Sequence, residues 1–258
     1  MSAIDKVRAA RANGRPTGLD FIKNIFEGFM ELHGDRRYSD DNAVVAGIAS
    51  LRGLPVTVIA LEKGHNTKEK VMRNFGSAHP EGYRKALRQM KLAEKFHRPI
   101  VCFVDTAGAY CGIQAEERGQ GQAIAENLME MMWLKTPVLS VFIGEGGSGG
   151  ALALAVADEV WMLENAVYSV ISPEGCASIL WKDPTKMQEA AESLKLTADD
   201  LLRLGVIERI IPEGDVSGMY AELSQRIHQM LCTYRAGDMQ NLAERRYARF
   251  RSMGVNQL

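Results

Sequence analysis

The segment that most constrains this chain is a run of five glycines within seven residues, from Gly144 to Gly150. It lies between an apolar stretch, residues 138–143, and a stretch of alanine, leucine and valine, residues 151–157, which is typical of a tightly packed helix. Glycine has no Cβ, so its backbone accepts positive φ and lets other groups approach closely. The first N–H groups of a helix lack intrahelical acceptors and lie at its positive end. We therefore expect a pocket here for an anion, or for charge that develops on oxygen during a reaction.

Three other interpretations of the run compete with this pocket. A flexible linker would not be flanked by apolar segments on both sides. A phosphate-binding P-loop needs lysine after its last glycine, whereas Gly149 is followed by another glycine. Residues 146–150 match G-x-S-x-G, in which Ser148 would be the nucleophile of a serine hydrolase. The one histidine downstream, His228, falls within an expected helix, a poor position for a catalytic base, so the hydrolase is the weaker alternative.

Strand and helix patterns alternate along the chain. Several of the strands are apolar throughout, which predicts an α/β fold whose sheet is covered by helices. The Arg52-Gly53 pair predicts a hairpin turn, and residues 63–78 predict a polar loop. Strands are expected at 43–51, 56–61, 99–104, 138–143, 159–163, 167–171 and 206–211, and helices at 19–32, 80–96, 115–133, 149–157, 173–181 and 197–204, before a long C-terminal amphipathic helix.

A second glycine turn, Asp105 to Gly112, follows the strand at 99–104 in the same way as the first. Ligands of α/β proteins bind at the carboxyl ends of strands. Two such turns can direct peptide N–H groups at one place, for example from Gly108-Ala109 and Gly146-Gly147. The alternative is two ordinary strand-to-helix turns that share no site.

The overall composition excludes several classes of function. A net charge of −1 over 258 residues gives no argument for nucleic acid or for a membrane surface. The apolar stretch after the glycine run is seven residues long, whereas a membrane span needs about 20. No C-x-x-C pair occurs, so we expect no metal site in this chain. Widely spaced cysteines and the absence of an apolar leader in residues 1–15 predict free thiols and a cytoplasmic protein.

Long and uncommon motifs then identify a family. They occupy residues 31–35, 63–69, 73–76, 80–88, 105–110, 112–121, 143–152 and 168–182. With them, residues 16–212 resemble the alpha subunit of bacterial acetyl-CoA carboxylase carboxyltransferase, although many members carry proline where this chain has Ala107 and Cys111. The resemblance implies a crotonase-like (ClpP/crotonase) fold of stacked ββα units. It implies a short leader at 1–18, the carboxyltransferase domain at 19–212 and a helical extension at 213–258.

The resemblance also implies a reaction. The family transfers the carboxyl group of carboxybiotin, presented by the biotin carrier protein, to acetyl-CoA, and the malonyl-CoA formed serves fatty acid biosynthesis. The family pattern puts the biotin-side oxyanion hole at the backbone amides of Gly146 and Gly147. Further substrate contacts are expected at Gly108, Ala109, Tyr110, Ser172 and Glu174.

The same resemblance implies partners. A carboxyltransferase beta subunit, forming an α2β2 heterotetramer, would contribute zinc and the acetyl-CoA-side oxyanion hole, and the biotin carboxylase would use ATP. No side-chain base is demanded, because decarboxylated biotin can take the methyl proton. Another crotonase-like acyl-CoA enzyme, such as a hydratase with Glu116 or Glu117 as base, is the main alternative. A non-catalytic scaffold is a third, although scaffolding needs no anion pocket.

Two basic clusters have less specific interpretations. Lys63, Lys68, Lys70 and Arg73 would meet CoA phosphates or a partner subunit, or they form a solvated loop. Arg245, Arg246, Arg249 and Arg251 are expected to form one charged face of the C-terminal helix.

Overall fold

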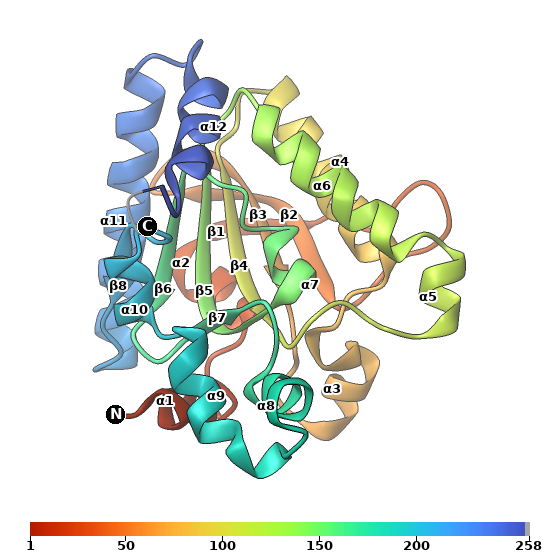
Figure 1. Cartoon of the computed structure of the whole chain (residues 1–258). Coiled ribbons are helices and arrows are strands. Elements are labelled where there is room, and N and C mark those ends of the chain that lie inside the picture. The colour runs from red at the N-terminus through yellow and green to blue at the C-terminus, as the bar shows by residue number, and fades with distance from the viewer. Residues whose placement is uncertain (256–258) are drawn as a thin grey trace.

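The structure is a computed structural model that describes residues 1–255. One mixed sheet forms its centre, in the order β1-β2-β3-β4-β5-β6-β8, with β7 paired to the end of β5 (Figure 1). The first three strands are antiparallel neighbours, and the strands from β3 to β8 run parallel. The strands are β1 (Glu27–Glu31), β2 (Val44–Leu51), β3 (Leu54–Leu61), β4 (Ile100–Thr106), β5 (Val138–Gly147), β6 (Glu159–Leu163), β7 (Val167–Ser169) and β8 (Arg209–Ile211).

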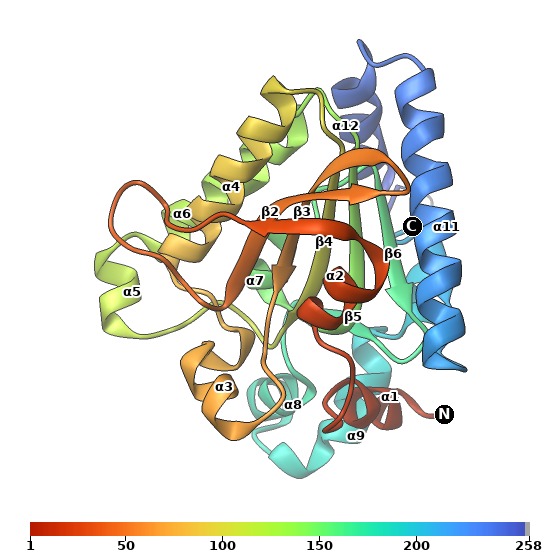
Figure 2. The same cartoon turned by 180° about the vertical axis from the view of Figure 1, so that it is seen from behind.

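Helices cover both faces of the sheet (Figures 1 and 2). One face carries α4 (Pro80–Lys95), α6 (Gln120–Trp133), α7 (Ser148–Leu152) and α12 (Leu242–Ser252). The opposite face carries α2 (Gly18–Ile25) and α11 (Val216–Ala236). The remaining elements are α1 (Ala3–Ala10), α3 (Thr67–Met72), η1 (Asn74–Gly76), α5 (Ile113–Glu117), α8 (Pro173–Trp181), η2 (Pro184–Lys186), α9 (Met187–Leu194) and α10 (Ala198–Arg203). The α/β class predicted from the sequence is confirmed.

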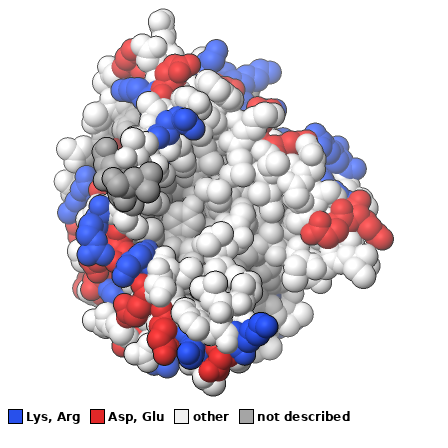
Figure 3. Space-filling model, viewed as in Figure 1, with Lys and Arg blue, Asp and Glu red and all other residues white. Residues whose placement is uncertain are grey.

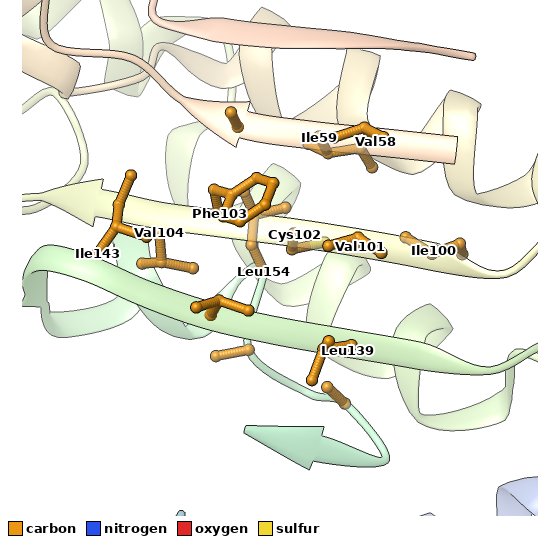
Figure 4. Packing of buried hydrophobic residues seen from close by; sticks show 14 of the residues in the cluster. Val58, Ile59, Ile100, Val101, Cys102, Phe103, Val104, Leu139, Ile143 and Leu154 are labelled. Atoms are coloured by element: carbon orange, nitrogen blue, oxygen red, sulfur yellow. The ribbon is translucent and has the colours of Figure 1, made fainter. Parts of the chain in front are cut away.

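The hydrophobic core is centred on β4. Every residue of Ile100–Thr106 is buried, because helices cover the side chains on both faces of this strand (Figure 4). On the α2 face, the ring of Phe103 packs 5.3 Å from Phe21, which packs 5.1 Å from Tyr220 of α11. This stack of aromatic rings joins α11 to the sheet through α2.

The hairpin predicted at Arg52-Gly53 is confirmed. Both residues have positive φ, 51° and 81°, and Leu51 pairs with Leu54 on either side of them. Two successive positive φ values give a two-residue turn whose twist matches that of the strands.

The helix expected at 19–32 is wrong in its second half. It ends at Ile25, Phe26 is extended, and residues 27–31 form β1 along the edge of β2. The apolar spacing suits either structure, but Gly28 has φ +61° and the free edge of β2 offers hydrogen-bond partners. The pairing of residues 27–31 with β2 therefore decides that this segment is a strand and not a helix.

Other differences from the expected elements have local causes. The helix expected at 115–133 divides at Gly119, which is left-handed with φ +84°. The helix expected at 149–157 ends at Leu152, and the residues after it form buried turns. The long C-terminal helix is two helices, the expected loop at 63–78 contains α3, and α9 was not predicted.

Helix α1 packs on α9 and against β5 and β7. The three-part division at residues 18 and 212 stays a prediction. In residues 1–255, no helix combines the length and apolar character that crossing a membrane requires.

Arg246 is not on a charged face, which corrects the expectation for the tail. It is 1% exposed and donates to both carboxylate oxygens of Asp158, over 3.1 and 2.8 Å. It also donates to the carbonyl oxygens of Met131 and Leu134 at the end of α6. This guanidinium therefore fastens α12 to the start of β5, where Asp158 accepts the N–H of Val138 over 2.7 Å.

Replacing Arg246 with alanine should lower the free energy of unfolding by about 3–5 kcal/mol, because Asp158 would be left buried and unpaired. Urea denaturation of the purified chain measures this loss. The exposed Arg251→Ala on the same helix is the matched control and should change stability by less than about 0.5 kcal/mol. Equal effects of the two substitutions would contradict the anchoring role.

Candidate functional site

The glycine run forms a sharp strand-to-helix turn. Strand β5 continues through Gly147, because Gly146 and Gly147 pair with Tyr168 and Ser169 of β7. Helix α7 begins at Ser148, whose φ of +53° is unusual for a residue with a side chain. The change from strand to helix thus takes place within one residue.

The two glycine turns touch each other through their backbones. A Cβ on Gly147 would lie 2.0 Å from the carbonyl oxygen of Ala107, and one on Gly150 would lie 2.4 Å from the nitrogen of Ala109. No side chain fits at such distances, so glycine is required at both positions. The structure thus brings together the turns that the sequence placed at 105–112 and 144–150.

One peptide donor at this junction is unpaired. The N–H of Gly108 donates to Thr106 Oγ1 over 3.1 Å, and the N–H of Tyr110 donates to the Ala78 carbonyl over 3.0 Å. The N–H of Ala109, between them, has no acceptor among the described residues. Ala109 is half-buried, and its nitrogen lies against Gly150, where a Cβ would be 2.4 Å away. Of the predicted donors Gly108 and Ala109, the geometry therefore favours Ala109.

Buried contacts hold the second turn in place. Gln120, at the start of α6, donates through Nε2 to the carbonyl oxygens of Ala78 and Tyr110, each over 2.8 Å. The ring of Tyr110 stacks on His79 with 4.1 Å between centroids. These contacts hold the turn that contains Ala107 and Cys111.

A chain of ion pairs lies beside the glycine run, and sequence reasoning missed it. Lys63 Nζ is 2.6 Å from Asp105, and Asp105 accepts the N–H of Glu145 over 2.8 Å. Arg11 joins Glu145 to Glu174, with 2.7 Å to each carboxylate. The carboxylate of Asp105 fits because Gly144 has no Cβ, which would lie 2.3 Å from it. In the sequence, the one sign of these ion pairs was Asp105, an acidic residue directly after an apolar strand.

Ser172 and Glu174 have local partners. The Ser172 hydroxyl accepts the N–H of Gly175 over 3.1 Å, so it caps α8. Partial burial opposes ionisation of Glu174, but its hydrogen bonds and the charge of Arg11 together outweigh burial and lower the pKa of Glu174. Their predicted part in substrate binding stays a prediction.

Two cavities flank β7. The cavity on the α1 side, between Arg11, Gly147 and Ser172, has a volume of about 20 Å³, which is room for one water molecule. The cavity on the α7 side is about 330 Å³, and Ser148, Leu152, Tyr168, Val170 and Leu201 are among its lining residues. The larger, mainly apolar cavity is the one with room for a small molecule.

The side chains proposed for the alternative enzymes are poorly placed. Ser148 is exposed and, within residues 1–255, hydrogen-bonds to no histidine; His228 contacts Cys232 on α11 instead, 3.6 Å from Nε2 to Sγ. Glu116 and Glu117 are exposed on α5 and line neither cavity. Across the described part of the chain, no three His, Cys, Asp or Glu side chains come together as metal ligands.

The junction of the turns makes a direct prediction about neighbouring glycines. Gly150→Ala should lower the free energy of unfolding by about 1–3 kcal/mol, because its methyl group overlaps the Ala109 nitrogen. Gly149→Ala is the matched control, because the nearest atom is Ile124 Cγ2 at 3.6 Å. That substitution should be neutral or stabilise by up to about 1 kcal/mol, as expected for alanine in a helix. Urea unfolding of both variants checks the ranking, and the reverse ranking would contradict the contact.

Tyr83 lies directly behind this junction and yields a second prediction. Its hydroxyl is buried and finds no hydrogen-bond partner among residues 1–255, and it lies 2.9 Å from where a Cβ of Gly150 would be. Burial and the charge of Asp41 raise the pKa of Tyr83. Tyr83→Phe should therefore raise the free energy of unfolding by about 1 kcal/mol, since an unsatisfied buried group is removed. A loss of stability in thermal and urea unfolding would show that the hydroxyl has a partner in solution.

Comparison with known proteins agrees with the resemblance noted in the sequence. The profile of a family described as acetyl co-enzyme A carboxylase carboxyltransferase-like matches residues 1–254. The acetyl-coenzyme A carboxylase carboxyl transferase subunit alpha of Ruminiclostridium cellulolyticum is 66% identical over 99% of both chains. A Natranaerobius thermophilus protein named as subunits beta/alpha is 54% identical over 98% of this chain and 43% of that protein.

Among solved structures, transcarboxylase 12S has the same fold. The TM-score is 0.73 at 21% identity, over 92% of this chain and 45% of the transcarboxylase chain. The crotonase-like fold expected from the sequence is thereby confirmed. The chain belongs to the family of acetyl-CoA carboxylase carboxyltransferase alpha subunits.

Proposed function

We propose that this chain is the alpha subunit that transfers the carboxyl group from carboxybiotin to acetyl-CoA, giving malonyl-CoA for fatty acid biosynthesis. The observation that carries the proposal is the backbone contact of the two glycine turns, with the unpaired Ala109 N–H beside them. Family membership supports the same reaction.

The chemistry needs donors for negative charge on oxygen. Carboxybiotin supplies the CO2 and, after losing it, a base for the methyl proton of acetyl-CoA. The chain's part is to stabilise the ureido oxygen of biotin as its negative charge grows. We assign this to the amides of Gly146 and Gly147, with the N–H of Ala109 as an added donor. Backbone donors that are already in place lower the barrier without reorganising during the reaction.

The cavity beside α7 suits a biotin ring. Its volume of about 330 Å³ lies within the range of small-molecule sites, and its walls are mainly apolar. Its lining includes Ser148 and Gly149, which follow the proposed donors in the chain, whereas Gly146 and Gly147 line the smaller cavity on the α1 side of β7. Gly108, Tyr110, Ser172 and Glu174 would then shape the surroundings of the substrate.

The face that carries α6 and α7 suits a protein partner. Figure 3 shows a hollow without charged residues in the middle of this face. Met129 and Trp133 on α6, Val170 after β7 and Tyr247 on α12 are large apolar side chains that remain exposed. Such surfaces mark interaction sites. The Natranaerobius protein that joins beta and alpha in one chain supports a beta subunit as this partner.

The assembly follows the family pattern. We propose an α2β2 heterotetramer in which beta contributes zinc and the acetyl-CoA-side donors. The biotin carrier protein presents carboxybiotin, and the biotin carboxylase makes it with ATP. Each of the four cysteines is a free thiol, which suits the reducing cytoplasm.

The test combines the purified chain with its cognate beta subunit and measures malonyl-CoA decarboxylation with free biotin as acceptor. Only the mixture should be active. Gly147→Val should lower kcat at least about 100-fold, because the side chain displaces Ala107 and with it the donors. Gly214→Ala, which lies outside both cavities and has nothing within 4 Å of its Cβ, should keep the rate within about twofold. Size-exclusion chromatography of each complex confirms assembly.

Two results would contradict the proposal. A mixture no faster than either subunit alone would rule out the reaction. A fully active and assembled Gly147→Val complex would place the oxyanion donors elsewhere.

A further inference from the structure

We propose that a groove along α4, remote from the glycine turns, binds a phosphorylated nucleoside. This α4 groove has a volume of about 460 Å³ and lies between α4, the loop at 35–37 and Glu126 of α6. Two carboxylates and six cationic side chains line it, the latter being Arg36, Arg37, Arg84, Arg88, Lys91 and Lys95. Arg84 and Lys91 also pair with Glu81 and Glu130, so among the described residues Arg36, Arg88 and Lys95 are the lining cations without an ion pair. In a chain of net charge −1, such a concentration of positive charge attracts anions.

The two carboxylates of the groove each face one cation already. Asp35 accepts from Arg84 Nε over 2.8 Å and from three backbone N–H groups, those of residues 37–39. Burial opposes its ionisation, but these hydrogen bonds outweigh burial and lower the pKa of Asp35. Glu126 is 3.8 Å from Arg37. Among the described residues, neither carboxylate forms a direct ion pair with Arg36 or Arg88, although the charge of Asp35 raises the pKa of Arg88.

Arg36 and Arg88 are forced together. Arg36 Nη1 and Arg88 Nη2 donate to the same oxygen, the carbonyl of His33, over 2.9 and 3.0 Å. Within residues 1–255 neither guanidinium has a carboxylate within 4.0 Å. Burial, and after it the charge of Arg36, lower the pKa of Arg88, while the charges of Asp40 and Asp35 oppose this lowering. Arg36 is also held in the left-handed region, with φ +65°.

This arrangement fits phosphate oxygens. Guanidinium groups present planar sets of N–H donors that match phosphate geometry, and an anion between two of them removes their repulsion. The hydrogen bonds to His33 fix both groups without neutralising them, so the positive charge of the pair is left for a ligand.

The rest of the groove suits an apolar ring. Leu87 is buried and Leu92 half-buried along the same side of α4. The methylene stems of Lys91 and Lys95 extend this surface, as long cationic side chains do. The volume falls within the range of small-molecule sites and exceeds what a single phosphate fills. A nucleoside carrying two phosphates matches both halves of the groove.

Two sources share this chemistry: a free nucleotide and the phosphorylated adenosine of coenzyme A. Isothermal titration of the purified full chain at low ionic strength should show binding of ADP, of coenzyme A or of both. If ADP binds more tightly, the ligand is a free nucleotide; if coenzyme A binds more tightly, the ligand is the phosphorylated adenosine of coenzyme A. Adenosine and inorganic phosphate should each bind at least roughly tenfold more weakly, because each offers half of the contacts.

Three variants locate the site. Arg36→Asn removes the charge with a residue that tolerates the left-handed region, and Arg88→Gln removes the other charge. Each should weaken binding at least roughly tenfold. Arg235→Gln, exposed on α11, makes the same change in net charge outside the groove and should leave binding unchanged. Arg36→Asn should also raise the melting temperature of the free chain, because the repulsion is relieved.

The proposal is overturned if neither ADP nor coenzyme A binds, or if Arg36→Asn and Arg88→Gln bind like the wild type. It is also overturned if Arg235→Gln weakens binding as much as they do. Inorganic phosphate binding as tightly as ADP would eliminate the nucleoside. None of these results depends on the carboxyltransferase activity.

Discussion

Close approach of two backbone turns is the constraint on which the site depends. Strands β4 and β5 are adjacent and parallel, so the turns that follow them leave the sheet about 4.8 Å apart. At that separation Gly147 and Gly150 meet Ala107 and Ala109 with no space for a Cβ. The glycines are therefore demanded by packing, and a run that resembles a flexible linker in composition becomes a rigid junction between strand, turn and helix.

Charge beside the junction is balanced by groups from distant parts of the chain. Asp105 and Glu145 would repel an anion that approached the glycine turns, but Lys63 lies between them, 2.6 and 3.5 Å from the two carboxylates. Arg11, from α1, adds a second cation to Glu145. The Lys63 pair with Asp105 is the more buried one, so it contributes more than the half-exposed Arg11 pairs. Segments 1–15 and 63–78 thus act on a site that neither contains.

The sequence predicted features whose causes are local. The glycine run, the Arg52-Gly53 hairpin and the buried β4 follow from conformational preference and apolar patterning. The ion pairs of Arg11 join residues 134 and 163 positions apart, and no local pattern encodes that separation. Residues 27–31 became a strand because β2 had a free edge, and Arg246 was buried because Asp158 needed a counterion. The motif resemblance suggested the candidate donors. It did not reveal that the N–H of Gly108 already donates a hydrogen bond to Thr106 Oγ1.

The unpaired Ala109 N–H indicates how the work is divided between this chain and a partner. The donor is positioned by the backbone, through Gln120 and Thr106, and not by a mobile side chain. A partner that docks on the uncharged face therefore need not order the donor, and little of its binding free energy is lost in doing so. Ordered backbone donors suit a half-site whose proton acceptor arrives with the substrate. On this view the beta subunit adds the second substrate's site to a pocket that the alpha chain has already built.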